Sequence, residues 1–188
     1  PAAFNFAAHL LALNAQRPQK PALIDDQGQL SYGELAQQVQ RVAAGLHALG
    51  LRREERVFLL MHDCSDWVAS FLGCLYAGVV PVAVNTLLTA ADYAYMLQHS
   101  RAQAALVSQA LLPTLQAALD QAQQSGGHEV KSIHVSRANA AALPAQAQAW
   151  ANLLAHAPCL ESAPTQGDEA AFWLYSSGST GRPKGTVH

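Results

Sequence analysis

The sequence has little of what defines several protein classes. Only three of its 188 residues are cysteines, and they form neither a CxxC pair nor a cysteine–histidine metal spacing. The pattern therefore argues against a disulfide-rich secreted fold and against a zinc module. It predicts a reducing, cytoplasmic setting in which the thiols act as small buried apolar side chains. The three cysteines are Cys64, Cys74 and Cys159.

An excess of charge of one sign is also lacking. Eleven basic and thirteen acidic residues give a formal net charge of −2. Because nucleic-acid backbones and anionic membranes attract strongly basic surfaces, the composition predicts neither as a partner. A small-molecule ligand is the better expectation.

Long apolar stretches are missing too. The longest, residues 71–84, is interrupted by Gly73, Gly78 and Pro81 and is shorter than the roughly 18 residues that a membrane-spanning helix needs. The N-terminal segment carries its basic residues after an apolar middle, the reverse of a secretory signal, and predicts an amphipathic helix. Since the chain lacks an initiating methionine, we expect this end to have been trimmed.

What the chain has is a core-forming composition and a regular alternation of elements. Hydrophobic residues make up 51%, enough for one substantial core. Apolar residues recur at helical spacing after Leu30, with a capping box at Ser31 and Glu34 and a stop at Gly50. Short apolar strands and helices then alternate. The expected strands are 56–61, 79–84, 104–107 and 132–135, and the expected helices are 65–76, 89–99, 109–124 and a short one near 150–155.

This alternation predicts an α/β fold with a mostly parallel, doubly wound sheet flanked by helices, since βαβ units join parallel strands. Residues 1–168 form the expected first subdomain. An irregular link with Pro158, Pro164 and Gly167 then leads into residues 169–188, which open the next part with a strand at 170–175 that we expect to be buried.

The densest chemical signal follows that strand. Residues 176–186 read Ser-Ser-Gly-Ser-Thr-Gly-Arg-Pro-Lys-Gly-Thr, with three glycines, five hydroxyls and two cations. Glycines let backbone amides approach phosphate oxygens, hydroxyls add donors that can also ligate Mg²⁺, and Arg182 and Lys184 supply charge. The spacing is not that of a Walker loop, because Pro183 precedes the lysine and Gly185 follows it. Composition alone leaves a phosphate site and a plain turn as alternatives.

The string YSSGSTGRPKGT resembles the phosphate-loop signature of the adenylate-forming superfamily, which comprises acyl- and aryl-CoA synthetases, luciferases and the adenylation domains of peptide synthetases. Ser176 and Ser179 stand where threonine is common, and both keep the hydroxyl. The resemblance covers nearly the whole chain, and the segment NTLLTAADYAYML is most similar to benzoate- and hydroxybenzoate-CoA ligases. It implies a part of the large N-terminal domain of such an enzyme.

Members of this superfamily convert a carboxylate and ATP into an acyl-adenylate and pyrophosphate, and then transfer the acyl group to a thiol. The resemblance therefore implies an AMP-forming aryl-CoA ligase that uses ATP, Mg²⁺ and CoA, with benzoate or a substituted benzoate as the acid. It also implies that Thr180 reaches Mg²⁺ through the phosphates and that Arg182 faces solvent. The residues implied to hold the β- and γ-phosphates are Ser176, Ser177, Gly178, Ser179, Thr180, Gly181 and Lys184.

The same resemblance places the catalytic lysine, the adenine and ribose motifs and most of the acyl pocket in a continuation beyond His188. We therefore expect a fragment of a larger enzyme that carries no catalytic residue of its own. Alternatives remain open: a medium-chain acyl-CoA ligase or another adenylation domain, a catalytically silent scaffold or dimerisation fragment, and a Walker-type hydrolase, which Pro183 disfavours. The residues do not distinguish CoA from a carrier-protein thiol, and a homodimer is compatible with them.

Other candidate residues are weaker. The eight histidines show no ligand spacing such as HExxH and are interpreted as exposed or hydrogen-bonded side chains. His62, Asp63 and Asp66 follow a strand at the edge where open α/β sheets bind ligands, but a helix cap by Asp63 or Ser65 explains them equally well. Asn85 is expected to stabilise the turn into Thr86. Trp67 and Trp173 are expected in the core, and Tyr93, Tyr95 and Met96 are expected to form core packing or interface contacts.

Overall fold

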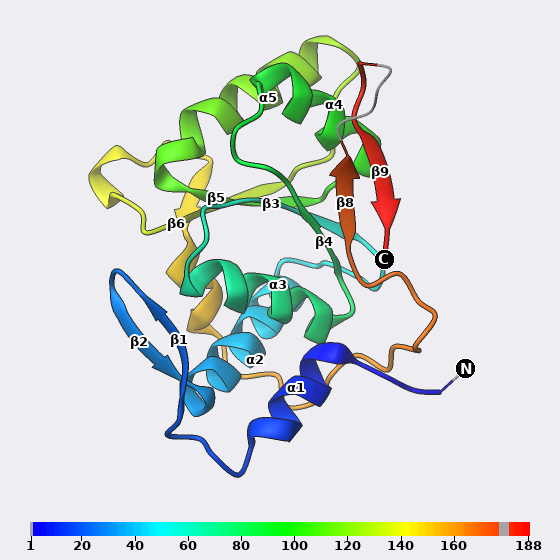
Figure 1. Cartoon of the computed structure of the whole chain (residues 1–188). Helices are drawn as coiled ribbons and strands as arrows, with labels where there is room; N and C mark the ends of the chain where they lie inside the picture. Colours follow the sequence, from blue (N-terminus) through cyan, green and yellow to red (C-terminus); the bar gives the residue numbers. More distant parts are fainter. Residues whose placement is uncertain (1, 177–180) are drawn as a thin grey trace.

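A seven-stranded sheet forms the centre of the computed structural model, which describes residues 2–176 and 181–188 (Figure 1). Its strands are β3 (Arg56–Leu60), β4 (Val80–Ala83), β5 (Ala104–Ser108), β6 (Ser132–Ser136), β7 (Ala147–Ala149), β8 (Trp173–Ser176) and β9 (Lys184–Val187). Their order is β7-β6-β5-β3-β4-β8-β9, and all neighbours are parallel except β8 and β9. The predicted mostly parallel, doubly wound sheet is confirmed.

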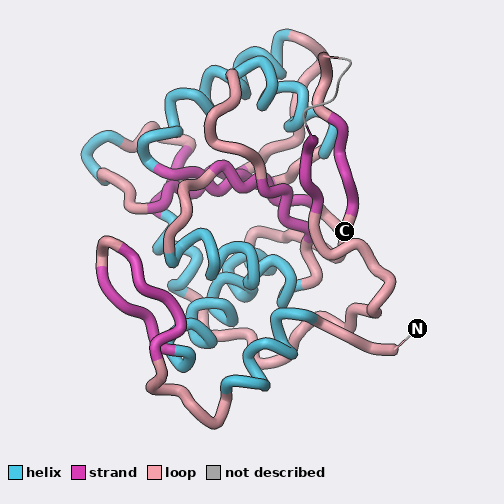
Figure 2. Tube along the Cα trace, viewed as in Figure 1, coloured by secondary structure: helices cyan, strands magenta, loops and turns pink. Residues whose placement is uncertain are grey.

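Helices cover both faces of this sheet (Figure 2). They are α1 (Phe6–Asn14), α2 (Tyr32–Ala48), α3 (Ser65–Ala77), α4 (Ala90–Ser100) and α5 (Leu112–Gln124), with 3₁₀ turns η1 (Gln109–Leu111), η2 (Ala140–Ala142) and η3 (Trp150–Ala155). A separate antiparallel hairpin of β1 (Pro21–Asp25) and β2 (Gly28–Ser31) lies beside α2 and α3.

The central strands are apolar on both sides because each side meets a helical layer. In β3, Val57 and Leu59 pack toward α2 and α3, whereas Phe58 and Leu60 pack toward α4 and α5. Strand β5 alternates in the same way. Continuous apolar runs of this kind are typical of parallel strands buried between two layers, and they account for the strands that the sequence made easiest to find.

Helix ends follow local capping chemistry. The Ser31 hydroxyl accepts a hydrogen bond from the Glu34 amide at 3.2 Å, and the Glu34 carboxylate accepts one from the Ser31 amide at 2.8 Å. The predicted capping box of α2 is thus confirmed. Gly50, with φ of +83°, follows the end of this helix in a left-handed conformation that glycine adopts without steric cost.

Several expectations need correction. The helix expected at 109–124 is divided into η1 and α5, with a proline in the first turn of α5. The strand expected at 170–175 begins only at Trp173 and is half-exposed, because β8 lies near the sheet edge, away from the centre of the two helical layers. Hairpin β1–β2, strand β7 and strand β9 were not predicted.

The expected burial of individual side chains is partly wrong. Tyr93 and Met96 are buried as expected, and burial raises the pKa of the equally buried Cys74 thiol. The remaining expected core side chains are only half-buried, because they lie at the margins of the helical layers. These are Cys64, Trp67, Cys159 and Trp173, whereas Tyr95 is half-buried and packs against the core, which agrees with the expectation for it.

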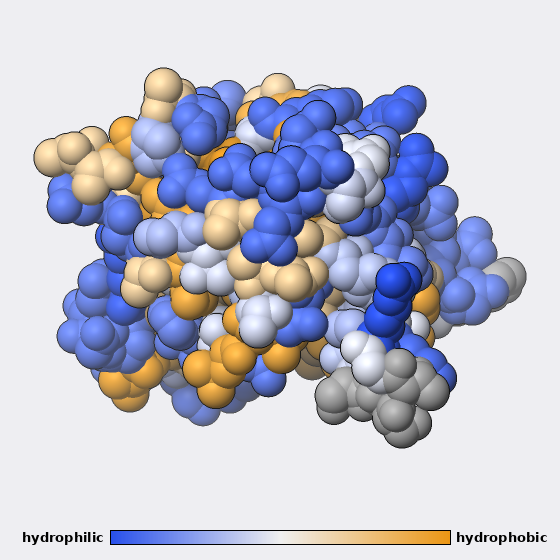
Figure 3. All heavy atoms as spheres, turned by 90° about the horizontal axis from the view of Figure 1, so that it is seen from above, coloured by the Kyte–Doolittle hydropathy of each residue, from blue (hydrophilic) through white to orange (hydrophobic). Residues whose placement is uncertain are grey.

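Viewed from the α4–α5 side, the surface is mostly hydrophilic, with hydrophobic side chains in scattered groups (Figure 3). Within the described residues, none of the helices combines the length and the hydropathy that crossing a membrane requires.

A candidate phosphate-binding hairpin

The predicted phosphate loop connects β8 and β9 at the edge of the large sheet. The two strands are antiparallel, with Tyr175 opposite Gly185 and Ser176 opposite Lys184. The Ser176 hydroxyl donates a hydrogen bond to the Lys184 carbonyl oxygen at 3.4 Å. The first and last of the predicted phosphate-binding residues are therefore brought together, although they lie eight positions apart in the sequence.

Three of the seven predicted residues lie in the described part of the chain. Ser176, Gly181 and Lys184 are all exposed, and Gly181 has φ of +85°, a left-handed conformation that favours glycine. The other four lie outside the described residues: Ser177, Gly178, Ser179 and Thr180. The phosphate-binding role of the whole set stays a prediction.

Helix α4 contacts both arms of this hairpin. The Tyr175 hydroxyl lies 2.8 Å from His99 Nδ1, within hydrogen-bond distance. The Arg182 guanidinium lies 5.7 Å from the centre of the Tyr95 ring, in cation–π geometry. Arg182 is exposed, as expected, but one side of it faces an aromatic ring.

Sequence reasoning missed these two α4 positions. Tyr95 and His99 are separated by four residues, so a helix places them on the same face, and their rings stack at 5.6 Å. That spacing was readable in the sequence. The partners Tyr175 and Arg182 were not, because they belong to a distant segment.

The chemistry of the described residues suits a polyphosphate. Lys184 is an exposed cation, Gly181 has space beside its backbone, and the exposed Ser176 hydroxyl could donate to a phosphate in place of its long 3.4 Å hydrogen bond to the Lys184 carbonyl. Across residues 2–176 and 181–188, His, Cys, Asp and Glu side chains do not gather in groups of three or more that could hold a metal ion. Phosphate and hydroxyl oxygens are hard ligands of the kind that Mg²⁺ prefers.

The carboxyl edge of the parallel strands was the weaker candidate site. Strands β3 and β5 are neighbours whose connections run to opposite sides of the sheet, and such a switch point often binds ligands. Here the Ser108 hydroxyl accepts a hydrogen bond from the His62 amide at 2.9 Å. The Asp66 carboxylate accepts one from the Ser136 hydroxyl at 2.7 Å. These polar groups thus hold neighbouring segments together.

Neither Asp63 nor Ser65 caps helix α3, contrary to expectation. The capping position is Cys64, which forms no side-chain cap. Asp25 in β1 supplies the carboxylate instead, because it accepts hydrogen bonds from the Ser65 amide at 2.9 Å and the Arg137 guanidinium at 2.8 Å. The Ser65 and Gln27 amides, with the Arg137 charge, lower the pKa of Asp25 to about 2.

One histidine departs from the expected exposed or hydrogen-bonded state. His134 in β6 is 2% exposed, and its Nδ1 has no hydrogen-bond partner among the described residues. Burial lowers the pKa of His134 to about 4, since an imidazolium is costly away from water. This side chain is neutral at physiological pH.

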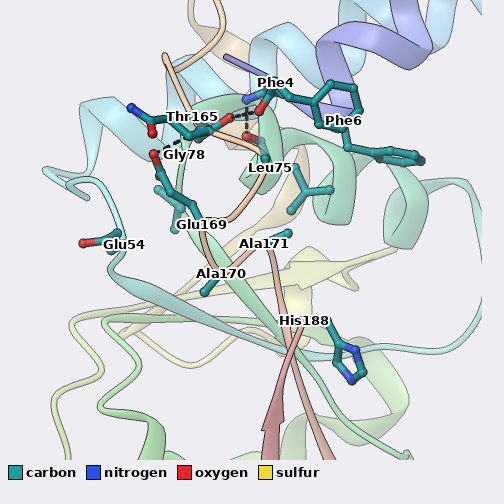
Figure 4. A pocket seen from close by; sticks show the side chains of 14 residues that line it. Phe4, Phe6, Glu54, Leu75, Gly78, Thr165, Glu169, Ala170, Ala171 and His188 are labelled. Carbon is teal, nitrogen blue, oxygen red and sulfur yellow. Dashed lines mark hydrogen bonds between the residues drawn. The ribbon is translucent and has the colours of Figure 1, made fainter. Parts of the chain in front are cut away.

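A pocket of about 170 Å³ lies at the opposite end of the β8–β9 hairpin, where His188 follows β9 (Figure 4). The N-terminal segment, the end of α3 and residues 165–171 surround it. Two of its polar side chains are already engaged: Glu169 pairs with Arg53, and the Thr165 hydroxyl donates to the Phe4 carbonyl. We interpret it as a packing junction between the first and last segments of the chain.

Comparison with known proteins identifies the family. Residues 11–188 match a family model described as "AMP-binding enzyme". The chain belongs to this family. The benzoate–CoA ligase of Thauera aromatica is 43% identical over 191 residues, covering 100% of this chain and 34% of the relative. The AMP-binding family member described here therefore spans about a third of the length of that curated relative.

Two solved structures extend the comparison. A benzoate CoA ligase from Burkholderia xenovorans LB400 is 44% identical, with a TM-score of 0.85 over 98% of this chain and 34% of the other. An anthranilate CoA ligase in complex with anthranoyl-AMP is 29% identical, with a TM-score of 0.89 over 100% of this chain and 35% of the other. Both are similar to this chain in fold as well as sequence.

Proposed function

We propose that this chain is the ATP-phosphate-binding part of an AMP-forming aryl-CoA ligase. The main observation in support is the β8–β9 hairpin. It pairs Ser176 with Lys184 at the two ends of the loop that bears the adenylate-forming signature. Membership of the AMP-binding family supports the use of ATP. The similarity to benzoate and anthranilate CoA ligases supports an aromatic acid and CoA as the other substrates.

The reaction has two balanced steps. A carboxylate oxygen attacks the α-phosphorus of ATP, and the bond to the bridging oxygen breaks so that pyrophosphate leaves. The CoA sulfur then attacks the acyl carbon, and AMP leaves with the electrons of the acyl–oxygen bond while the thiol proton is released. Activation is needed because a carboxylate is a poor electrophile, whereas the mixed anhydride expels a stable phosphate.

The role of this chain in the first step is to hold the β- and γ-phosphates. Negative charge builds up on the departing pyrophosphate, so donors and cations fixed beside it lower the barrier. Lys184 supplies charge and Ser176 a hydroxyl, and the signature residues 177–181 supply further hydroxyls and glycine amides. Mg²⁺ would neutralise phosphate charge, and Thr180 is proposed to reach it through the phosphates.

The proposal also covers the division of the chain into two parts and its location in the cell. Residues 1–168 act as the first α/β subdomain, and residues 169–188 open the next part with strand and phosphate loop. No residue of this chain is assigned as catalytic, and a cytoplasmic location accords with the use of ATP and CoA. Strand β8 pairs with β4 of the first subdomain, so the two parts share one sheet.

The test is exchange of labelled pyrophosphate into ATP by the complete polypeptide that carries this chain. The acids supplied are benzoate, hydroxybenzoates, aminobenzoate, medium-chain fatty acids and, as control, none. We expect exchange only with aromatic acids, and CoA-dependent thioester formation with the same acids. Exchange with fatty acids alone would replace the aryl assignment, and a folded polypeptide that exchanges with no acid would favour a silent scaffold.

A further inference from the structure

Four side chains join helix α4 to the two ends of the phosphate loop, and we call them the aromatic clasp: Tyr95, His99, Tyr175 and Arg182. We propose that the aromatic clasp positions the loop for ATP. This role rests on the proposed function, because it concerns how that site is held. Its members would act through the loop and are positioning residues.

The clasp holds the first end of the loop through Tyr175, which immediately precedes Ser176. Its hydroxyl lies 2.8 Å from His99 Nδ1, and the two rings meet edge to face at 5.7 Å. Burial, with the neighbouring Tyr95, raises the pKa of Tyr175, so the phenol stays protonated and can donate. The His99 ring also lies 6.1 Å from that of Trp173. The end of β8 therefore rests on one face of α4.

The clasp holds the second end through Arg182, which follows Gly181. Its guanidinium lies 5.7 Å from the centre of the Tyr95 ring. Beyond it, the Gly185 backbone passes close to the rings, since a Cβ added there would lie 3.4 Å from His99 Cε1 and 3.5 Å from Tyr175 Cε1. Both arms of the hairpin are thus held against two side chains one turn apart on a single helix.

Helix α4 is a firm base for this contact. Its opposite face buries Tyr93, Met96 and Leu97 in the core that α4 shares with α5. A capping box of Thr89 and Asp92 fixes its N-terminal end. Because the packed helix already orders the loop ends, they lose less conformational entropy when a phosphate chain binds. The clasp should therefore favour ATP over the other substrates.

The test compares two substitutions that remove the same hydrogen bond and keep an aromatic ring, Tyr175→Phe and His99→Phe, in the complete polypeptide. The control is Tyr76→Phe in α3, away from the β8–β9 hairpin, which removes the 2.9 Å hydrogen bond that the Tyr76 hydroxyl donates to the Leu160 carbonyl. Each variant is assayed for pyrophosphate exchange with ATP and the aromatic acid varied separately. Hydrogen exchange of the β8 and β9 amides is measured in parallel.

We expect each clasp variant to lower kcat/KM for ATP about five- to tenfold, in line with the loss of one hydrogen bond. The KM for the acid should stay within about twofold, and the double variant should be no worse than either single one because the two changes remove one interaction. The β8 and β9 amides should exchange faster, and those of α3 should not. Tyr76→Phe should leave kcat/KM for ATP and the hydrogen-exchange rates of the β8 and β9 amides unchanged.

A further variant, Tyr95→Leu, removes the ring under Arg182 and should lower kcat/KM for ATP about twofold or more, since exposed cation–π contacts are weak. The proposal is overturned if the KM for the acid changes as much as kcat/KM for ATP, or if Tyr76→Phe lowers kcat/KM for ATP as much as the clasp variants do. It is also overturned if hydrogen exchange of the β8 and β9 amides is unaltered in the clasp variants. If the unmodified polypeptide shows no pyrophosphate exchange, the proposed function fails. The hairpin amides would then decide separately whether the clasp holds the loop ends.

Discussion

The centre of the sheet and its β8–β9 edge are built for different tasks. In β3 and β5, Phe58 and Leu106 are fully buried between two helical layers. In the hairpin, Leu174 is 39% exposed and Val187 is 57% exposed, and every residue of β9 faces solvent to some degree. Stability therefore depends on the centre, whereas the proposed chemistry lies at an accessible edge. Substitutions should separate the two properties.

The largest effect should come from emptying the centre. Phe58→Ala removes a ring that packs edge to face on Tyr93 at 6.1 Å, and should lower the free energy of unfolding by about 3–5 kcal/mol. Val187→Ala at the exposed edge should change it by about 0.5 kcal/mol or less. Urea unfolding of both variants measures the difference. Equal losses would show that the edge contributes as much stability as the centre.

A pH titration sharpens the comparison at the buried His134. Its pKa is about 4 in the folded protein and about 6.5 when exposed, so only the unfolded chain gains the proton between these values. The contribution of His134 to the free energy of unfolding should be fully present above about pH 6.5, and the free energy of unfolding should fall by about 3 kcal/mol as the pH drops to 4. His134→Leu should remove this dependence. His9→Gln, at an exposed position, is the control and should retain it.

For the β8–β9 loop, Thr180→Ala should slow adenylation about ten- to a hundredfold, because the proposed role of the Thr180 hydroxyl is to donate a hydrogen bond to the departing pyrophosphate. It should change the binding of the aromatic acid far less, and it should leave the unfolding free energy nearly unaltered. Pyrophosphate exchange and urea unfolding report the two properties. Lys184→Ala should have a smaller effect, since a flexible lysine acts as a point charge. An unchanged adenylation rate in Thr180→Ala would refute the phosphate-loop assignment.

The smallest effect concerns Asp25 in β1, which lies neither at the centre of the large sheet nor in the β8–β9 hairpin. Its folded pKa of about 2 lies below the usual value of 3.8, so its contribution to stability is present above about pH 4 and is lost as the pH falls through 2. Asp25→Asn keeps an oxygen acceptor for the Ser65 amide and removes the titrating charge. Its unfolding midpoint should vary less with pH between 4 and 2. An unchanged profile would mean that another carboxylate controls this range.

Local signals in the sequence predicted the centre better than the edge. The Ser31–Glu34 capping box and the apolar run of β3 depend on neighbouring residues, and both are found as expected. Strand β9 was missed because it begins with Lys184 and Gly185, which have little strand propensity, and its structure depends on pairing with β8. The alternation of strands and helices was enough to predict parallel pairing.

The candidate site was predictable in composition but not in its supports. The Ser, Thr, Gly and Lys pattern predicted a phosphate loop, and its family resemblance implied the proposed chemistry. The contact of His99 with Tyr175 joins residues far apart in sequence. So does the capping of α3 by Asp25 in place of Asp63 or Ser65. Contacts of this kind follow from the arrangement of elements in space, which residue spacing alone does not specify.

The position of β8 has a consequence for the order in which the protein is built. Strand β8 pairs with β4, yet β5, β6 and β7 come between them in the chain. During synthesis from the N-terminus, five strands of the sheet leave the ribosome before Trp173 does. Until β8 follows, one edge of β4 therefore has no partner strand. Such an edge can pair with other chains until the hairpin closes it. Pairing with β8 therefore covers the β4 edge and makes β9 the last strand of the sheet.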